Sequence, residues 1–292
     1  MIKLDGNLLC QRRRSFPEMS FKMGPEYTVW EKEQTAILAS LSGKDVSLLF
    51  SGGKDSSLCL HFMLAASKDY GFNIEVYAVT FPEHRYNTPE VKTIDAFWKD
   101  RGLTILWYDA ARSDDSLKAA ANPCIVCVQA RKQLLHKVIG TKSTDLANLV
   151  LVNGYTLWDL VSYSLEYLIG GVYAQPDKEG VQRSRKRFME TGQRFYPFLQ
   201  MEGGYSIYRP ILKFNTQDVI RIIQEASIPF LSTPCHYAQF RPKRLLESYY
   251  RSMSLHFDHN RVVDFVKQHL GLPSMGEYLS MSKKYFRKQK FY

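Results

Sequence analysis

The sequence contains no run of about eighteen consecutive apolar residues, so it offers no segment that could cross a membrane as a helix. Its five cysteines are too few and too unevenly placed for a disulfide framework, and such cysteines in a reducing compartment are structural, metal-binding or catalytic. Internal repeats and low-complexity tracts are also missing. Residues 1–14 place their apolar side chains before their arginines, the reverse of a secretory signal. We therefore expect a cytoplasmic protein without membrane spans.

The composition is that of a globular protein with excess positive charge. Hydrophobic residues make up 45% and charged residues 23% of the 292 residues, which excludes disordered and collagen-like classes and leaves room for one large or two modest domains. There are 39 Lys and Arg against 29 Asp and Glu, a formal net charge of +10. Such an excess attracts polyanions, above all nucleic acid, although a basic enzyme without such a partner has the same composition.

From residue 45 onward, short apolar runs alternate with helical spacing. The apolar runs predict strands over residues 46–50, 73–81, 103–108, 149–152 and 205–210. Helical spacing predicts helices over residues 56–68, 90–101, 127–139, 157–168 and 216–226, and continues after residue 242. This alternation predicts an α/β fold with a doubly wound, mostly parallel sheet, whose ligands bind outside the carboxyl ends of the strands. Residues 1–44 are expected to be irregular.

A polar turn with the sequence SGGKDSS, Ser51–Ser57, follows the first predicted strand and precedes a helix. Its two glycines permit backbone angles at which successive amides point into one concavity, and a helix N-terminus directs free N–H groups there. Lys54 adds a point charge, and Asp55 is a candidate magnesium ligand. Ser56 or Ser57 is expected to cap the helix or to bind a phosphate oxygen. The turn predicts phosphate binding; an ordinary Gly-Gly turn with a serine cap is the alternative.

Three cysteines form a second candidate site. Cys124 and Cys127 make a Cys-x-x-Cys at the start of a predicted helix, where the helix dipole lowers thiol pKa values, and Cys235 follows a proline much later in the chain. Three interpretations stay open: a structural zinc completed by Cys235 and His236, a redox dithiol, or an iron–sulfur cluster. Cys59 lies on the apolar face of the helix after the turn and is expected to be a core residue.

The turn resembles the Ser-Gly-Gly-x-Asp-Ser signature of the PP-loop ATP pyrophosphatase family, and it lacks the glycine and lysine spacing of a Walker loop. The resemblance implies cleavage of ATP between its α and β phosphates, with Mg²⁺, transfer of AMP to a substrate oxygen and release of pyrophosphate. It also implies that the second strand contacts adenine through its backbone at Ala78-Val79-Thr80.

The wider pattern is similar to the TtcA/TtuA group of tRNA 2-thiolation enzymes, across roughly residues 45–240. The matching segments are Ser51–Ser57, Pro123–Cys127, Gly154–Asp159, Tyr208-Arg209-Pro210 and Pro234-Cys235. In that group three cysteines bind a [4Fe-4S] cluster and leave one iron without a protein ligand. The resemblance implies that Cys124, Cys127 and Cys235 are the ligands here.

The same resemblance implies roles for further residues. Arg131 stands four residues after the second cysteine, where relatives carry a basic residue, and Asp159 fits the second of two aspartates. The chain departs from the group at Tyr155, where a histidine is common, and at Trp158, where the first aspartate usually stands. The implied catalytic residues are Lys54, Asp55, Arg131 and Asp159. The implied nucleotide-binding residues are Ser51, Gly52, Gly53, Lys54, Asp55, Ser56, Ser57, Ala78, Val79 and Gly154.

Three regions follow from this interpretation. Residues 1–44 are expected to be an N-terminal extension, and residues 45–215 a PP-loop domain with a basic insertion at 176–204. Residues 216–292 are expected to be a C-terminal helical region with the third cysteine and a basic tail.

The expected activity is ATP-dependent sulfur transfer to a base carbonyl, in particular tRNA pyrimidine 2-thiolation. The expected partners are a sulfur donor and tRNA or another nucleic acid, held by the basic loop 183–194 and the tail 283–292; a homodimer is left open. The alternatives are a PP-loop adenylating enzyme acting on DNA, a deazaguanine-type precursor or a small metabolite, and a non-catalytic, zinc-containing nucleic-acid-binding protein.

Overall fold

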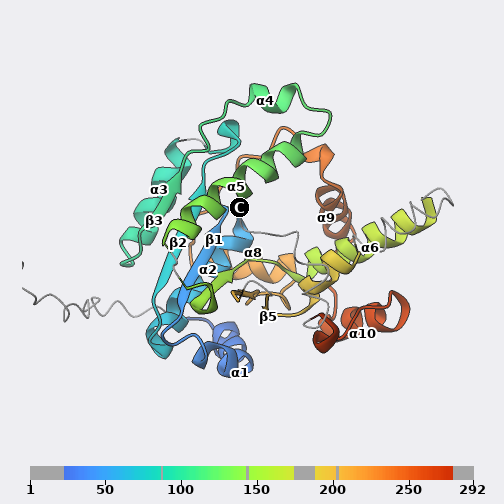
Figure 1. Cartoon of the computed structure of the whole chain (residues 1–292), viewed down its shortest axis with the longest axis horizontal. Coiled ribbons are helices and arrows are strands. Elements are labelled where there is room, and N and C mark those ends of the chain that lie inside the picture. Colours follow the sequence, from blue (N-terminus) through green and yellow to red (C-terminus); the bar gives the residue numbers. More distant parts are fainter. Residues whose placement is uncertain (1–22, 87, 143–144, 174–187, 202–203, 279–292) are drawn as a thin grey trace, which may run out of the picture.

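The computed structural model describes residues 23–86, 88–142, 145–173, 188–201 and 204–278. Within them, six strands form one sheet in the order β3-β2-β1-β4-β6-β5 (Figure 1). The strands are β1 (Asp45–Phe50), β2 (Ile74–Val79), β3 (Ile105–Tyr108), β4 (Leu149–Val152), β5 (Phe198–Gln200) and β6 (Ser206–Tyr208). Neighbouring strands are parallel except β5 with β6. The predicted doubly wound, mostly parallel sheet is confirmed, and only the antiparallel edge strand β5 was not foreseen.

Helices alternate with these strands along the chain. The described α-helices are α1 (Pro25–Ala39), α2 (Lys54–Tyr70), α3 (Thr88–Lys99), α4 (Asp115–Lys118), α5 (Pro123–Lys142), α6 (Leu157–Tyr173), α8 (Thr216–Glu225), α9 (Pro242–Ser252) and α10 (His259–His269). Short 3-10 turns are η1 (Glu83–Arg85), η2 (Leu146–Asn148), η3 (Gln193–Phe195) and η4 (Ala238–Phe240). No described helix is both long and apolar enough to cross a membrane.

The two faces of the sheet have separate hydrophobic cores. In β4, Val150 and Val152 pack into the core that contains residues of α1, α2, α3 and α8. Leu149 and Leu151 of the same strand pack into the core that contains residues of α5, α6 and α10. Because alternate side chains of a strand point to opposite faces, a strand buried on both sides is apolar throughout, as the short apolar runs of the sequence are.

The expectation that residues 1–44 are irregular is wrong for residues 25–39, which form α1. Pro25 stands in the first turn, where its missing N–H costs no hydrogen bond, so it starts this helix instead of breaking it. Trp30 of α1 is 3% exposed and lies against Phe62 of α2, with ring centroids 5.0 Å apart. Its indole N–H donates to the carbonyl of Pro210 at 2.7 Å. Helix α1 is therefore part of the same core as the sheet.

Part of the predicted nucleic-acid contact lies outside the described residues. This applies to residues 183–187 of the basic loop and to the tail 283–292. The end of the predicted insertion is described, and it contains η3 and the edge strand β5.

Replacing Trp30 by Ala is expected to lower the free energy of unfolding by about 3–5 kcal/mol, because it leaves a cavity against Phe62 and removes the hydrogen bond to Pro210. Denaturant unfolding followed by circular dichroism measures this change. The neighbouring Val29 is 61% exposed, so Val29→Ala serves as the matched control and is expected to change stability by less than about 0.5 kcal/mol. Equal effects of the two substitutions would show that α1 is not part of the core.

Candidate nucleotide and cysteine site

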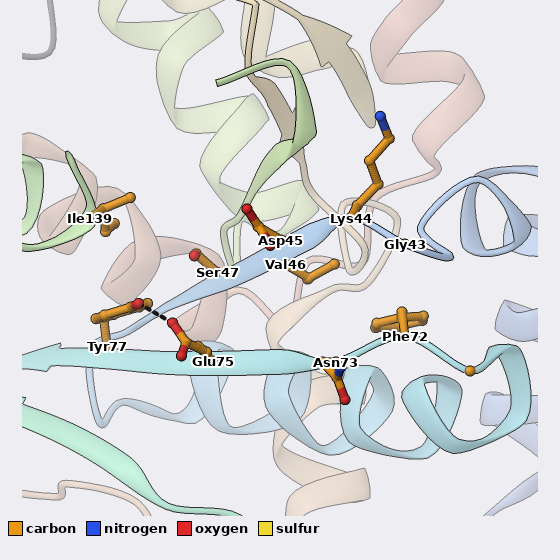
Figure 2. Close-up of a pocket in the computed structure, with 11 residues that line it drawn as sticks. Gly43, Lys44, Asp45, Val46, Ser47, Phe72, Asn73, Glu75, Tyr77 and Ile139 are labelled. Carbon is orange, nitrogen blue, oxygen red and sulfur yellow. Dashed lines mark hydrogen bonds between the residues drawn. The ribbon is translucent and has the colours of Figure 1, made fainter. Parts of the chain in front are cut away.

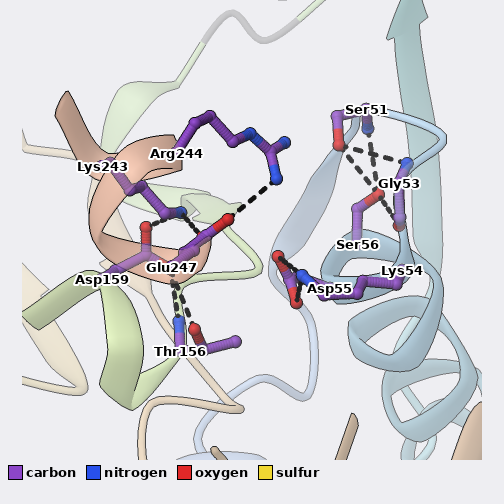
Figure 3. A network of polar contacts seen from close by, with 10 residues as sticks. All are labelled: Ser51, Gly53, Lys54, Asp55, Ser56, Thr156, Asp159, Lys243, Arg244 and Glu247. Atoms are coloured by element: carbon purple, nitrogen blue, oxygen red, sulfur yellow. Dashed lines mark hydrogen bonds and ion pairs between the residues drawn. The ribbon is translucent and has the colours of Figure 1, made fainter. Parts of the chain in front are cut away.

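The predicted phosphate turn connects β1 to α2 at the carboxyl edge of the sheet (Figure 3). Gly52 has a φ of 72°, a value that residues with side chains adopt at a cost. A Cβ atom on Gly52 would lie 2.4 Å from Cδ1 of Leu231, so glycine is required for space as well. The Gly52 carbonyl accepts a hydrogen bond from the N–H of Leu231 at 2.7 Å. The turn is thereby joined to the loop that leads to Cys235.

Two serines hold the turn closed. Ser56 Oγ lies 3.1 Å from Ser51 Oγ, accepts from the Ser51 N–H at 3.2 Å and donates to the Gly53 carbonyl at 2.9 Å. Gly53 is the N-cap of α2, and no side chain caps this helix, which excludes the alternative of a serine cap. The first N–H groups of α2 therefore remain available to an anion. Ser56 and Ser57 are both buried, and the Ser57 hydroxyl has no hydrogen-bond partner among the described residues.

The first two residues of α2 form an ion pair. Nζ of Lys54 lies 2.9 Å and 3.0 Å from the two carboxylate oxygens of Asp55. Both side chains are largely buried, with 13% and 19% of their surface exposed. The predicted phosphate-binding cation and the predicted magnesium ligand thus neutralise each other in this structure.

The other predicted nucleotide-binding residues lie beside the turn. A Cβ atom on Gly154, just after β4, would lie 3.0 Å from the carbonyl oxygen of Asp55, an approach that only glycine permits. Ala78 pairs with Phe50 in the sheet, so the end of β2 lies next to the start of the turn. The side chains of Ala78 and Val79 are buried in the core, which leaves only backbone for contact with a base.

Asp159 is buried in the first turn of α6 and takes part in a charged network with α9 (Figure 3). One of its carboxylate oxygens accepts from the N–H of Thr156 at 2.9 Å and from the Thr156 hydroxyl at 3.1 Å. The other oxygen pairs with Lys243. Lys243 also lies 3.3 Å from Glu247, and Arg244 contacts Glu247 at 2.9 Å.

These charges stabilise one another despite their burial. Burial disfavours the ionised form of Asp159, but Lys243 and the donors of Thr156 outweigh it and hold the pKa of this carboxyl below its ordinary value. Burial also disfavours the protonated form of Lys243, but Asp159, Glu247 and Asp55 raise its pKa. Because Asp55 contributes, the network lies within electrostatic range of the phosphate turn. Both carboxylates that the sequence marked as catalytic are paired with lysines.

The three predicted cluster ligands gather at the start of α5. Cys124 and Cys127 lie on the first turn of this helix, where Asn122 Oδ1 accepts the N–H of Cys124 at 3.1 Å. The Cys124 thiol donates to the carbonyl of Tyr237, at 3.6 Å from sulfur to oxygen. Tyr237 comes two residues after Cys235, so the remote third cysteine returns to the pair. All three thiols are partly exposed.

Burial raises the pKa of both Cys124 and Cys127, and the nearby Cys235 raises it further, while Arg241 acts in the opposite direction. The expectation that the helix start lowers these pKa values is wrong, because burial outweighs the helix dipole. In the described ranges, no three His, Cys, Asp or Glu side chains are spaced to hold a single metal ion. This finding gives no support to a zinc site with His236 as a ligand.

Positive charge collects between the turn and the cysteines. Nη2 of Arg85 lies 3.5 Å from the point where a Cβ atom on Gly53 would be, so the guanidinium is close to the turn. The Nε of Arg85 is buried and has no hydrogen-bond partner among the described residues. Burial lowers the pKa of Arg85, and the nearby Arg131 and Arg244 lower it further. Arg131 also acts on Cys127, so the predicted basic residue lies between the two centres. Such an uncompensated charge suits a polyphosphate.

Several site residues were missed by sequence reasoning. They are Arg85, Thr156, Lys243, Arg244 and Glu247. The spacing of Lys243 and Glu247 at i, i+4 in the predicted C-terminal helix was a readable signal for an ion pair. Nothing in the sequence indicated that this pair is buried against Asp159.

A second cavity, of about 640 Å³, lies at the opposite edge of the sheet, between the starts of β1 and β2 (Figure 2). Asp45 and Glu75 contribute carboxylates to its lining, and the Tyr77 hydroxyl donates to Glu75. Its two glycines, Gly43 and Gly71, follow the C-terminal ends of α1 and α2, and no N-terminus of a described helix is among its lining residues. It therefore does not match the phosphate turn that the sequence predicts.

No protein-family model matches the sequence, and neither does any curated protein. Solved structures are similar to it. The U34-tRNA thiolase NcsA from Methanococcus maripaludis, a structure with its [4Fe-4S] cluster, matches with a TM-score of 0.53 and 16% identity, over 90% of this chain and 79% of that one. NAD+ synthetase from Burkholderia pseudomallei matches with a TM-score of 0.41 and 13% identity, over 90% of this chain and 88% of that one. NMN synthetase from Francisella tularensis matches with a TM-score of 0.40 and 11% identity, over 90% of this chain and 94% of that one.

The chain thus has an α/β fold similar to that of this solved tRNA thiolase, with the mostly parallel sheet that the sequence predicted. Among the three structures, the tRNA thiolase alone has a TM-score above 0.5, and at 16% identity this likeness concerns the fold.

Replacing Gly52 by Ala is expected to weaken ATP binding about tenfold or more, because the new Cβ displaces Leu231 and distorts the turn. Gly43→Ala is the matched control, since Gly43 has nearly the same φ, 73°, but no atom within 4 Å of a Cβ. The control is expected to show only the backbone strain of about 1–2 kcal/mol and unchanged ATP affinity. Calorimetric titration with ATP and denaturant unfolding separate these effects. Equal ATP affinities of the two variants would contradict the role of Gly52.

Replacing Asp159 by Asn is expected to lower the free energy of unfolding by about 3–5 kcal/mol at neutral pH, because Lys243 loses a buried partner. The folded pKa of Asp159 lies below the ordinary 3.8, so its contribution is complete above that pH and is lost as the pH falls further, through the folded pKa. The stability difference from wild type is therefore expected to shrink below about pH 4. Asp115→Asn, at an exposed pair with Lys118, is the control and should change stability little. A difference independent of pH would contradict this account.

Proposed function

We propose that this protein is an ATP-dependent sulfurtransferase that activates a carbonyl oxygen of a tRNA base with AMP and replaces that oxygen by sulfur. The observation that carries the proposal is the hydrogen bond from Leu231 to Gly52 in the phosphate turn. Four residues after Leu231 comes Cys235, which acts electrostatically on Cys124 and Cys127. One short loop thus links the candidate nucleotide site to the three thiols.

The first half of the reaction needs a site for a triphosphate. The free N–H groups at the start of α2 and the side chain of Lys54 bind its phosphates. Asp55 is released from Lys54 when the phosphates take the lysine, and can then hold Mg²⁺. Arg85 and Arg131 neutralise the departing pyrophosphate. A base carbonyl oxygen attacks the α phosphorus, and the bond from this phosphorus to the bridging oxygen of pyrophosphate breaks.

The donor set fits an iron–sulfur cluster. Cys235 lies close enough to Cys124 and Cys127 to raise the pKa of both, so three thiols are available to hold a cluster at three of its corners. When bound, a [4Fe-4S] cluster there supplies one iron that is open to the sulfur donor. The neighbouring Arg131 and Arg241 favour the thiolate forms of these cysteines. Such a cluster is present in the solved tRNA thiolase with the similar fold.

The second half of the reaction depends on placing two reactants together. AMP on the base oxygen converts it into a good leaving group, and sulfur must reach the same carbon before water does. Holding both reactants in one cleft contributes about 7–11 kcal/mol in favourable cases. The net charge of +10 favours binding of a nucleic acid as the acceptor.

The test uses anaerobically prepared full-length protein. Cys124→Ser is expected to lose the iron, the sulfide and the visible absorbance of the cluster, and with them the formation of 2-thiolated nucleosides in tRNA. Iron and sulfide analysis and mass spectrometry of digested tRNA measure these two losses. Cys59→Ala is the control, since Cys59 is fully buried in the core and is expected to leave cluster content unchanged.

Normal product formation by an aerobically prepared, metal-free protein would overturn the proposal. Adenylation of a small molecule without any thiolated nucleoside would assign the chain to a different PP-loop reaction.

A further inference from the structure

The backbone next to Cys235 is held by a histidine from a different part of the chain. The N–H of His236 donates to Nε2 of His84 at 3.1 Å, and His84 belongs to η1, between β2 and α3. The two imidazole rings are stacked, with centroids 4.0 Å apart and an interplanar angle of 8°. His84 also meets the ring of Tyr237 edge-on at 5.8 Å. The segment that carries the third thiol is therefore in contact with His84 through its backbone and through two side chains.

Asp114 fixes the orientation of His84. Oδ2 of Asp114 lies 2.5 Å from Nδ1 of His84 and accepts the backbone N–H of His84 at 3.1 Å, while Oδ1 accepts the backbone N–H of Glu83 at 2.9 Å. Because Nδ1 must carry the proton that it shares with Asp114, Nε2 keeps the lone pair that accepts the His236 N–H. The ring can therefore neither flip nor change tautomer without losing one of these bonds.

The start of the same loop is tied elsewhere. Leu231 donates to Gly52, and Glu90 of α3 accepts from the N–H of Ser232 at 3.0 Å and from the Thr233 hydroxyl at 2.8 Å. These bonds fix residues 231–233 but lie before Cys235. His84 holds the chain on the other side of that cysteine.

We propose that His84, oriented by Asp114, is a positioning residue that sets the place of the Cys235 thiolate relative to Cys124 and Cys127. This inference rests on the cluster assignment of the proposed function. It adds that the site depends on a hydrogen-bond acceptor at the place of Nε2. Groups that orient the ligands of a metal centre commonly contribute about 10- to 100-fold to metal affinity.

The test compares three variants with wild type. His84→Ala is expected to retain iron about tenfold or more weakly in competition with a chelator after anaerobic reconstitution with iron and sulfide, and to change the electron paramagnetic resonance spectrum of the reduced cluster. His84→Gln keeps an acceptor near the place of Nε2 and is expected to restore most of the iron retention. His269→Ala, at an exposed histidine on α10, is the matched control and should behave as wild type.

A measurement on the metal-free protein distinguishes a loss of positioning from misfolding of the variant. In the metal-free full-length protein, hydrogen exchange at the amide of His236 is expected to rise in His84→Ala and to remain slow in His84→Gln, while the unfolding midpoints stay similar. Equal iron retention and equal spectra in His84→Ala and wild type would overturn the inference. So would a failure of His84→Gln to restore retention while His236 exchange remains slow. A wild-type protein that binds no cluster at all would instead overturn the proposed function.

Discussion

The hydrogen bond between Leu231 and Gly52 is the contact on which the site depends. It forms because the chain at Gly52 carries no side chain and has a positive φ, so another segment can approach the backbone closely. The segment that approaches is the one that brings Cys235 to Cys124 and Cys127. The backbone geometry of this turn thereby also sets the position of the cysteine loop, and the two candidate sites are joined by a direct contact.

Most charged groups of the candidate site are paired with each other, so a bound ligand would replace one of these partners. Lys54 neutralises Asp55, and Lys243 neutralises Asp159, so the two carboxylates do not repel each other in the ligand-free structure. Arg85 differs, because its buried Nε has no partner among the described residues. An entering polyanion could therefore give this nitrogen a hydrogen-bond partner. The candidate site therefore favours negative charge near Arg85, while the charges of the two lysine–aspartate pairs cancel.

Most of the sheet was predictable because each of its central strands is buried on both faces and reads as an apolar run. β5 was missed because an edge strand of three residues is too short to give a pattern. Helix α1 was not predicted, although Pro25 stands in its first turn, a position where proline starts a helix. The turn and the three cysteines were identifiable, since their chemistry depends on residues close in sequence or on a family resemblance.

The charged groups around the site could not be predicted in the same way. His84, Asp114 and His236 are far apart in sequence, and no local spacing relates them. The pKa of the cysteines was predicted in the wrong direction, because the helix dipole is visible in a sequence pattern while burial is a property of the folded chain.

The indole of Trp30 reaches a carbonyl that lies 180 positions further along the chain, beyond every strand of the sheet. A polypeptide cut to begin at β1 would contain every motif named above, but it would leave the ring of Phe62 and the carbonyl of Pro210 without their covering helix. The segment that contains all of the sequence motifs is therefore shorter than the segment needed to form the complete hydrophobic core, which includes α1. Since this contact forms only when both ends of the fold are present, the closing of the interior must wait until nearly three quarters of the chain has been made.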